Sequence, residues 1–127
     1  MQETKQQTES NRNLKMVSKV INEKATTYSE FKIAILEYLK NNLDKQLIKF
    51  IYKTKDGNRR FASGTTHKAF LKQNFNIELK DTYSSREGLI TYFDTDKKNW
   101  RSFREENLLD ITHLYNLQED GKLVFID

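Results

Sequence analysis

Residues 89–111 read Leu-Ile-Thr-Tyr-Phe-Asp-Thr-Asp-Lys-Lys-Asn-Trp-Arg-Ser-Phe-Arg-Glu-Glu-Asn-Leu-Leu-Asp-Ile. An apolar stretch, a polar turn and a second apolar stretch follow one another, which is the pattern of a β-ribbon. The returning strand carries Trp100, Arg101 and Arg104, and a third strand begins at Leu108. Large rings and arginines on one ribbon can stack flat ligands and bind anions. This segment therefore predicts both a β fold and a candidate binding surface.

A second ribbon precedes the first one in the chain. From residue 46, large apolar residues recur at every second position, starting with Ile48, as in a half-buried strand. Asp56-Gly57 predicts a two-residue hairpin turn, because both residue types tolerate positive φ. Residues 59–65 are the predicted return strand, in which Gly64 marks a bulge or the strand end.

The residues before the ribbons predict a helix. Residues 27–45 carry apolar side chains at helical spacing, so we expect an amphipathic helix with Ser29 as its N-cap. Its stripe is wide, and Phe31 and Tyr38 are candidate contacts for a protein partner. Residues 1–26 are mostly polar and predict a flexible or partly helical N-terminal extension.

The order of elements predicts a mainly β protein with an N-terminal α-helix. A short helix or turn is expected at residues 67–75, a polar loop at 76–88, and a closing strand at 123–126. Five short strands with a tight hairpin favour a small closed barrel over a sandwich. We assign this barrel to residues 46–127.

The net charge of +4 is unevenly distributed along the chain. Residues 46–80 carry eight basic against two acidic side chains, whereas residues 81–127 carry six basic against ten acidic ones. This segregation predicts a polarised surface with an anionic partner on one side. An equally simple alternative is that the lysines protect strand edges against aggregation.

Several function classes are disfavoured by what the sequence contains. It has no cysteine, and its two histidines, His67 and His113, are far apart without a recognisable metal-ligand spacing. No glycine-rich phosphate loop is present among the four dispersed glycines. We therefore expect a protein that is not an enzyme and that needs no metal or cofactor.

The sequence also bears on location. No apolar run approaches the roughly 18 residues needed to cross a bilayer, and the first residues lack the apolar core of a secretion signal. The expected location is the cytoplasm, without membrane association.

The ribbon resembles a known family. Tyr92-Phe93-Asp94, a four-residue turn, and the run Trp-Arg-Ser-Phe-Arg at 100–104 are similar to the WYL-type domain, and the hairpin at 48–65 looks like that of its compact phage and mobile-element branch. The resemblance covers about residues 46–112. It implies a small SH3-like (Sm-like) five-stranded barrel that binds nucleic acid or senses a ligand, in a host bacterial cytoplasm if phage-encoded.

Single positions can be compared with that family. Only Tyr92, Arg101 and Arg104 match positions with a binding role there. Thr91 stands where the family's naming tryptophan is expected, and Asn107 stands where an arginine is usual.

The combined reading gives a set of candidate nucleic-acid-binding residues. Arg104 and the cations of the hairpin would form a patch that tracks phosphates if the two ribbons lie side by side. Trp100 either stacks a base or caps the barrel, and Arg101 either binds or pairs with Asp94 or Glu105. The full set is Lys53, Lys55, Arg59, Arg60, Tyr92, Trp100, Arg101 and Arg104.

Three functions remain open at this point. The first is binding of RNA or single-stranded nucleic acid by a small non-enzymatic barrel. An alternative is a protein-binding inhibitor of a host nucleic-acid-processing or CRISPR-type defence complex. A second alternative is a sensor of a small anionic ligand.

Overall fold

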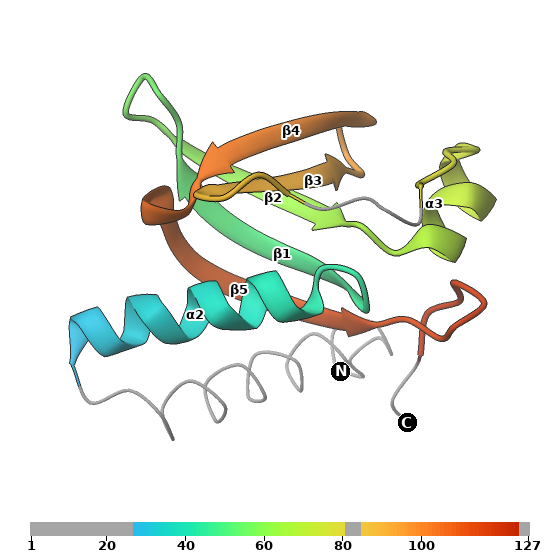
Figure 1. Ribbon diagram of the computed structural model, residues 1–127, viewed down its shortest axis with the longest axis horizontal. Helices are drawn as coiled ribbons and strands as arrows, with labels where there is room; N and C mark the ends of the chain where they lie inside the picture. Colours follow the sequence, from blue (N-terminus) through green and yellow to red (C-terminus); the bar gives the residue numbers. More distant parts are fainter. Residues whose placement is uncertain (1–26, 81–84, 125–127) are drawn as a thin grey trace, which may run out of the picture.

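A strongly bent antiparallel sheet with one helix across its concave side forms the body of the protein (Figure 1). This computed structural model describes residues 27–80 and 85–124, so the predicted N-terminal extension, residues 1–26, lies outside the described residues. The elements in chain order are α2 (Tyr28–Asn42), β1 (Gln46–Lys53), β2 (Arg59–Thr65), α3 (Lys68–Phe75), β3 (Leu89–Asp94), β4 (Asn99–Arg104), the 3-10 helix η1 (Glu105–Asn107) and β5 (Leu108–Asn116).

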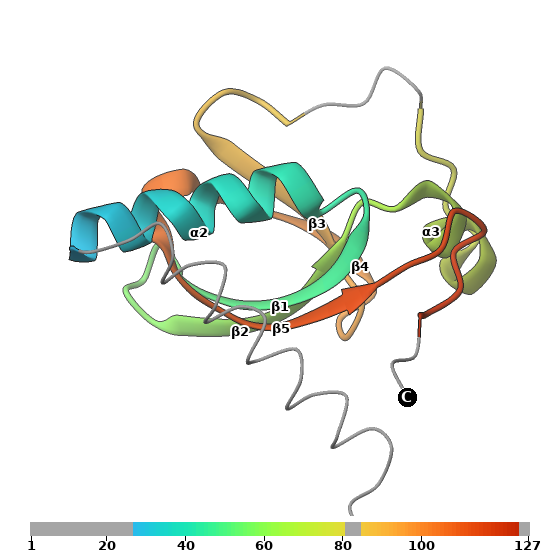
Figure 2. The same cartoon turned by 90° about the horizontal axis from the view of Figure 1, so that it is seen from below.

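The five strands pair in the order β4-β3-β2-β1-β5. The two edge strands, β4 and β5, are joined by the single turn η1, so the sheet has to curl until its edges approach each other. Figure 2 shows this bend in β1, β2 and β5, with α2 lying along its inner side. The predicted class, mainly β with an N-terminal helix and five strands, is confirmed.

Strict alternation along β1 builds the core. Ile48, Phe50 and Tyr52 point inward and are buried, while the residues between them face outward. The Tyr52 ring stacks on Phe103 of β4, with centroids 4.1 Å apart and an interplanar angle of 8°. This contact joins the two ribbons, and α2 closes the core with Ile35 and Leu39, which are buried on its inner face.

The hairpin between β1 and β2 differs from the expected two-residue turn. Lys53 and Arg59 are the last paired residues, and Thr54 N–H donates to the Asn58 carbonyl at 2.7 Å. Inside this pair, Gly57 N–H donates to the Thr54 carbonyl at 3.0 Å, and Gly57 alone in the turn has positive φ, at 85°. The loop is therefore a longer turn that ends in a left-handed glycine, not an Asp-Gly pair with two positive φ angles.

The N-cap of helix α2 lies two residues before the expected one. Thr27, not Ser29, is the N-cap, and its Oγ1 accepts from Glu30 N–H at 3.1 Å. The Glu30 carboxylate reaches back to the Thr27 hydroxyl at 3.2 Å. Thr27 and Glu30 thus form a Thr-x-x-Glu capping arrangement, a signal that the sequence carries and that the choice of Ser29 overlooked.

Replacing Thr27 with alanine is expected to lower the free energy of unfolding by about 1 kcal/mol, because one backbone N–H at the helix start loses its acceptor. Ser29→Ala is the matched control and should change stability little, since Ser29 is exposed and is not the cap. Urea unfolding of both variants measures the difference. Equal losses for the two variants would contradict the assignment of Thr27.

The end of the chain differs from the expected closing strand at residues 123–126. The fifth strand is β5, which extends to Asn116, and the tail adds a single bridge between Leu117 and Leu123. Gly121 brings this tail against the start of α3, where a side chain would collide with the backbone of Phe70. The tail is thus held by a turn and a bridge, and residues 125–127 are outside the described part.

Candidate functional site

A cavity of about 540 Å³ opens at the mouth of the bent sheet, between the β1–β2 hairpin and the ends of β3 and β4. The stacked rings of Tyr52 and Phe103 form part of its wall. We call it the mouth cavity. Its lining residues are Tyr52, Lys53, Thr54, Lys55, Asp56, Arg60, Leu89, Ser102, Phe103, Arg104 and Asn107.

Four of the predicted cations meet in this cavity. Lys53, Lys55 and Arg60 come from the hairpin, and Arg104 comes from the end of β4. Asp56 is the one carboxylate among the lining residues. The two ribbons therefore do lie side by side at this end, and the cavity has an excess of positive charge that favours an anionic ligand.

Arg104 is available to such a ligand. Its Nη1 lies 3.9 Å from Glu106 Oε1, and both side chains are largely exposed. An exposed ion pair of this length contributes little to stability, so a phosphate can replace the carboxylate at small cost.

Arg60 is held at the cavity wall by a buried pair of tyrosines. Its Nη1 donates to the Tyr52 hydroxyl at 3.2 Å, and its guanidinium carbon lies 5.9 Å from the centre of that ring. The hydrogen bond with Tyr52 raises the pKa of Arg60, which keeps it charged. The Tyr52 hydroxyl in turn lies 2.7 Å from that of Tyr92. This arrangement fixes Arg60 and leaves its other N–H groups to bind an anion.

Tyr92 itself is not a contact residue in this structure. Its side chain is 0% exposed and lies in the core beneath β2, and burial raises the pKa of its hydroxyl, which therefore stays protonated. The expectation that Tyr92 touches a ligand is thus wrong for this conformation, because its ring packs against Phe50 at 5.0 Å. Tyr52, and not Tyr92, is the tyrosine that lines the cavity.

Tyr52 and Asn107 are the informative residues that sequence reasoning missed. Tyr52 is one of the alternating apolar residues of the strand that begins at residue 46. Its role could have been found from the strand pairing that the hairpin turn sets. A hairpin that pairs Lys53 with Arg59 places Tyr52 directly opposite Arg60. Asn107 was noted as a departure from the family pattern, yet it lines the mouth cavity.

Arg59 lies beside the cavity but does not line it. It pairs with Lys53 across the hairpin and is exposed. Alternation turns Arg60 toward the mouth and Arg59 toward the outer face of the sheet. These two neighbouring arginines therefore serve different surfaces.

Trp100 and Arg101 lie toward the opposite end of β4 from Arg104. Trp100 is 39% exposed and packs edge-to-face on Phe93, with centroids 5.5 Å apart. Arg101 Nε lies 3.5 Å from Asp94 Oδ2, which is the predicted ion pair. The structure does not bring these two residues to the mouth cavity, because four residues of strand, roughly 13 Å, separate Trp100 from Arg104.

Phe31 and Tyr38 face the protein's own core. Both pack against it and are partly buried, and the Tyr38 hydroxyl donates to Gln46 Oε1 at 3.0 Å. Both side chains thus cover the sheet, and their docking of a protein partner stays a prediction. On the same helix, Ile33 is 58% exposed and faces away from the sheet.

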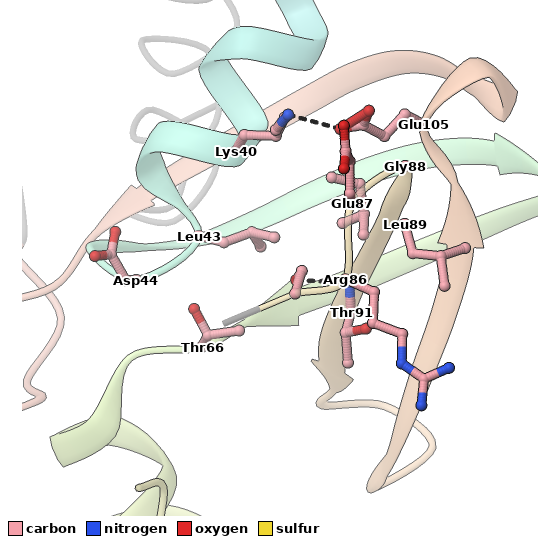
Figure 3. Close-up of a pocket in the computed structure, with 12 residues that line it drawn as sticks. Lys40, Leu43, Asp44, Thr66, Arg86, Glu87, Gly88, Leu89, Thr91 and Glu105 are labelled. Atoms are coloured by element: carbon pink, nitrogen blue, oxygen red, sulfur yellow. Dashed lines mark hydrogen bonds and ion pairs between the residues drawn. The ribbon is translucent and has the colours of Figure 1, made fainter. Parts of the chain in front are cut away.

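A second cavity, of about 350 Å³, lies between α2, β3 and the turn before it (Figure 3). Lys40 and Glu105 form an ion pair of 2.7 Å above it, and Arg86 extends away from that pair. Its charged lining residues are Lys40, Asp44, Arg86, Glu87 and Glu105, which are more acidic than basic. This cavity is therefore less suited to a polyanion than the mouth cavity is.

In residues 27–80 and 85–124, no group of three His, Asp or Glu side chains is placed to hold a metal ion. Within the same part of the chain, no helix is both long and apolar enough to cross a membrane.

Comparison with known proteins supports the fold and its relationship. The family model described as WYL_2, Sm-like SH3 beta-barrel fold, matches residues 36–109, which are more than half of the chain. Comparisons with curated proteins and with solved structures gave no match. The matched region runs from α2 to the start of β5 and includes every residue that lines the mouth cavity. The resemblance to the WYL-type domain is thus confirmed, and the chain belongs to the WYL_2 family of Sm-like SH3 β-barrels.

Proposed function

We propose that this protein is a non-enzymatic barrel that binds RNA or single-stranded nucleic acid through the mouth cavity. The supporting observation is that Lys53, Lys55, Arg60 and Arg104 converge on one cavity walled by aromatic rings. Cations at the rim can hold backbone phosphates, while a ring can stack an unpaired base. The family resemblance extends the proposal to a phage or mobile-element protein that acts in a bacterial cytoplasm.

The shape of the site favours a single strand over a duplex. Cations from the hairpin and from β4 line one concave cavity together with the rings of Tyr52 and Phe103. An isolated nucleotide can enter such a cavity, whereas the paired bases of a duplex are turned away from it.

The proposal is tested by fluorescence anisotropy with a labelled single-stranded RNA, titrated at several salt concentrations. Each phosphate held by a cation should contribute about −0.7 to the slope of log K against log salt. Four cations therefore predict a slope of up to about −3. A duplex of the same sequence is the control and should bind more weakly. An affinity that is independent of salt would rule out the proposed role of the cations.

A second candidate function is recognition of a small anionic ligand at the same place. The volume of about 540 Å³ is within the range of small-molecule pockets, roughly 300–1,000 Å³. Competition with mononucleotides separates the two functions. A mononucleotide that displaces the RNA at an equal concentration would favour a ligand sensor, whereas a need for several linked nucleotides favours strand binding.

A further inference from the structure

The outer face of the sheet carries a prominent exposed ring. Phe61 of β2 is 73% exposed, more than any other large apolar side chain in the described residues. It is a strand residue on the side of the sheet away from α2, so it belongs neither to the core nor to the mouth cavity. A single exposed ring is common on protein surfaces, so the residues around Phe61 decide what it can bind.

Cations surround this ring. Phe61 pairs with Ile51 of β1, and alternation places Lys49 and Lys53 on either side of Ile51 on the same face. Arg59, two residues before Phe61, is also on this face and is exposed. Diagonal neighbours in a sheet are roughly 7–8 Å apart, which is within reach of long side chains.

Strand β5 extends the aromatic surface. His113 pairs with Lys49, and its ring is nearly parallel to that of Tyr115, with centroids 6.2 Å apart and an interplanar angle of 6°. Lys49 Nζ lies 5.9 Å from the centre of the Tyr115 ring. Asp110, opposite Ile51, is the carboxylate on this part of the face. We call Phe61, His113 and Tyr115, with Lys49, Lys53 and Arg59, the outer aromatic face.

We propose that the outer aromatic face is a second binding surface for single-stranded nucleic acid, with a base stacked on Phe61 and phosphates held by Lys49, Lys53 and Arg59. This inference rests on the proposed function of the mouth cavity. Lys53 connects the two surfaces, because it lines the cavity and also pairs with Arg59 at the end of the outer face. A strand that leaves the cavity over the hairpin therefore reaches Phe61.

The composition of the face favours nucleic acid over a protein partner. The centre of a protein–protein interface is depleted in lysine, because burying the ammonium group is costly. Here the lysines of β1 lie next to aromatic rings on the two adjacent strands, β2 and β5. Rings that stack bases and cations that track phosphates are the two requirements for holding a single strand.

The experiment compares a short and a long labelled single strand, of about 4 and 12 nucleotides, because small barrels occupy about 4–16 nucleotides. Phe61→Ala should weaken binding of the long strand by roughly 5- to 150-fold, the range for loss of one stacked base. It should leave the short strand nearly unaffected and the salt slope unchanged. Phe61→Trp, which keeps a ring, should retain the affinity, whereas Arg59→Gln should reduce the slope by about 0.7.

Ile33→Ala is the matched control, since it removes an exposed apolar side chain from α2, on the other side of the sheet. Circular dichroism and size-exclusion chromatography check that each variant is folded and unchanged in self-association. If Arg104→Gln weakens binding while Phe61→Ala matches the wild type with the long strand, this inference fails and the proposed function stands. If the wild type binds neither strand, both fail. A Phe61→Ala variant that alters only self-association would also overturn the inference.

Discussion

Replacing Gly64 with alanine is expected to destabilise this protein strongly. A methyl group at Gly64 would collide with the Tyr92 ring and would lie 3.2 Å from Cε1 of Phe50. Both rings are buried in the core, and neither can move without displacing other rings. Overpacking of this kind costs about 1–3 kcal/mol, and we expect the upper end, which lowers Tm by roughly 10–20 °C.

Gly88 provides the contrast for this experiment. A methyl group at Gly88 would meet no atom within 4 Å, but its φ of 81° is unfavourable for alanine. Gly88→Ala should therefore cost only about 1 kcal/mol, from backbone strain alone. Thermal and urea unfolding of the two variants measure the difference. A loss at Gly64 no larger than that at Gly88 would contradict the close approach of Tyr92 to β2.

The structure gives a different reason for Gly64 from the one that the sequence suggested. Gly64 was expected to mark a bulge or the strand end, but it pairs in regular register with Ile48, and β2 continues to Thr65. The reason for glycine here is the space needed by a ring from another strand. A contact between residues so distant in the chain has no local signature.

Removing the two arginines of the mouth cavity is expected to have the largest effect on binding. Arg60→Gln and Arg104→Gln should each weaken affinity for single-stranded RNA about tenfold or more at low salt, because hydrogen bonds to charged groups contribute about 1.5–3 kcal/mol. The double variant should lose about 100-fold, and each change should reduce the salt slope by about 0.7. Glutamine keeps a polar side chain at this partly exposed position, so the fold should be retained.

Lys72→Gln is the control for general electrostatic attraction. Lys72 is on α3, is exposed, and pairs with Glu78 at 2.5 Å. Its substitution therefore removes one positive charge at a site away from the cavity. Anisotropy titrations of all variants in the same buffer allow a direct comparison. Equal losses for Lys72→Gln and the cavity variants would show that net charge, and not the mouth cavity, determines affinity.

Local sequence patterns predicted the elements well. Alternation from residue 46 and the run from Arg59 to Thr65 defined β1 and β2, and the polar turn at 95–98 separated β3 from β4. These features depend on neighbouring residues, whose side chains alternate or recur with a fixed period. The same alternation holds on β4, where Phe103 is buried between its exposed neighbours Ser102 and Arg104.

Which residues meet in the mouth cavity depends on how distant strands pair, and local sequence patterns do not show this pairing. Strand β2 pairs with β3 only at Gly64–Asp94 and Thr65–Phe93, and this short contact decides which end of β4 meets the hairpin. It brings Arg104 to the cavity and leaves Trp100 and Arg101 at the other end. The contact role of Tyr92 was implied by the family resemblance, whereas the structure buries its ring. Strand β3 is covered on both sides there, with Phe75 of α3 lying 4.8 Å from Phe93.

The pair of tyrosine hydroxyls has a consequence for how such a barrel can diversify. Tyr92 contacts Gly64 on one side and, through Tyr52, supports Arg60 on the other. Changes to this inner layer would alter ligand affinity and folding together, so few of them can be tolerated. Lys55 and Arg104, by contrast, can vary without disturbing the interior, and new specificities would arise more readily there.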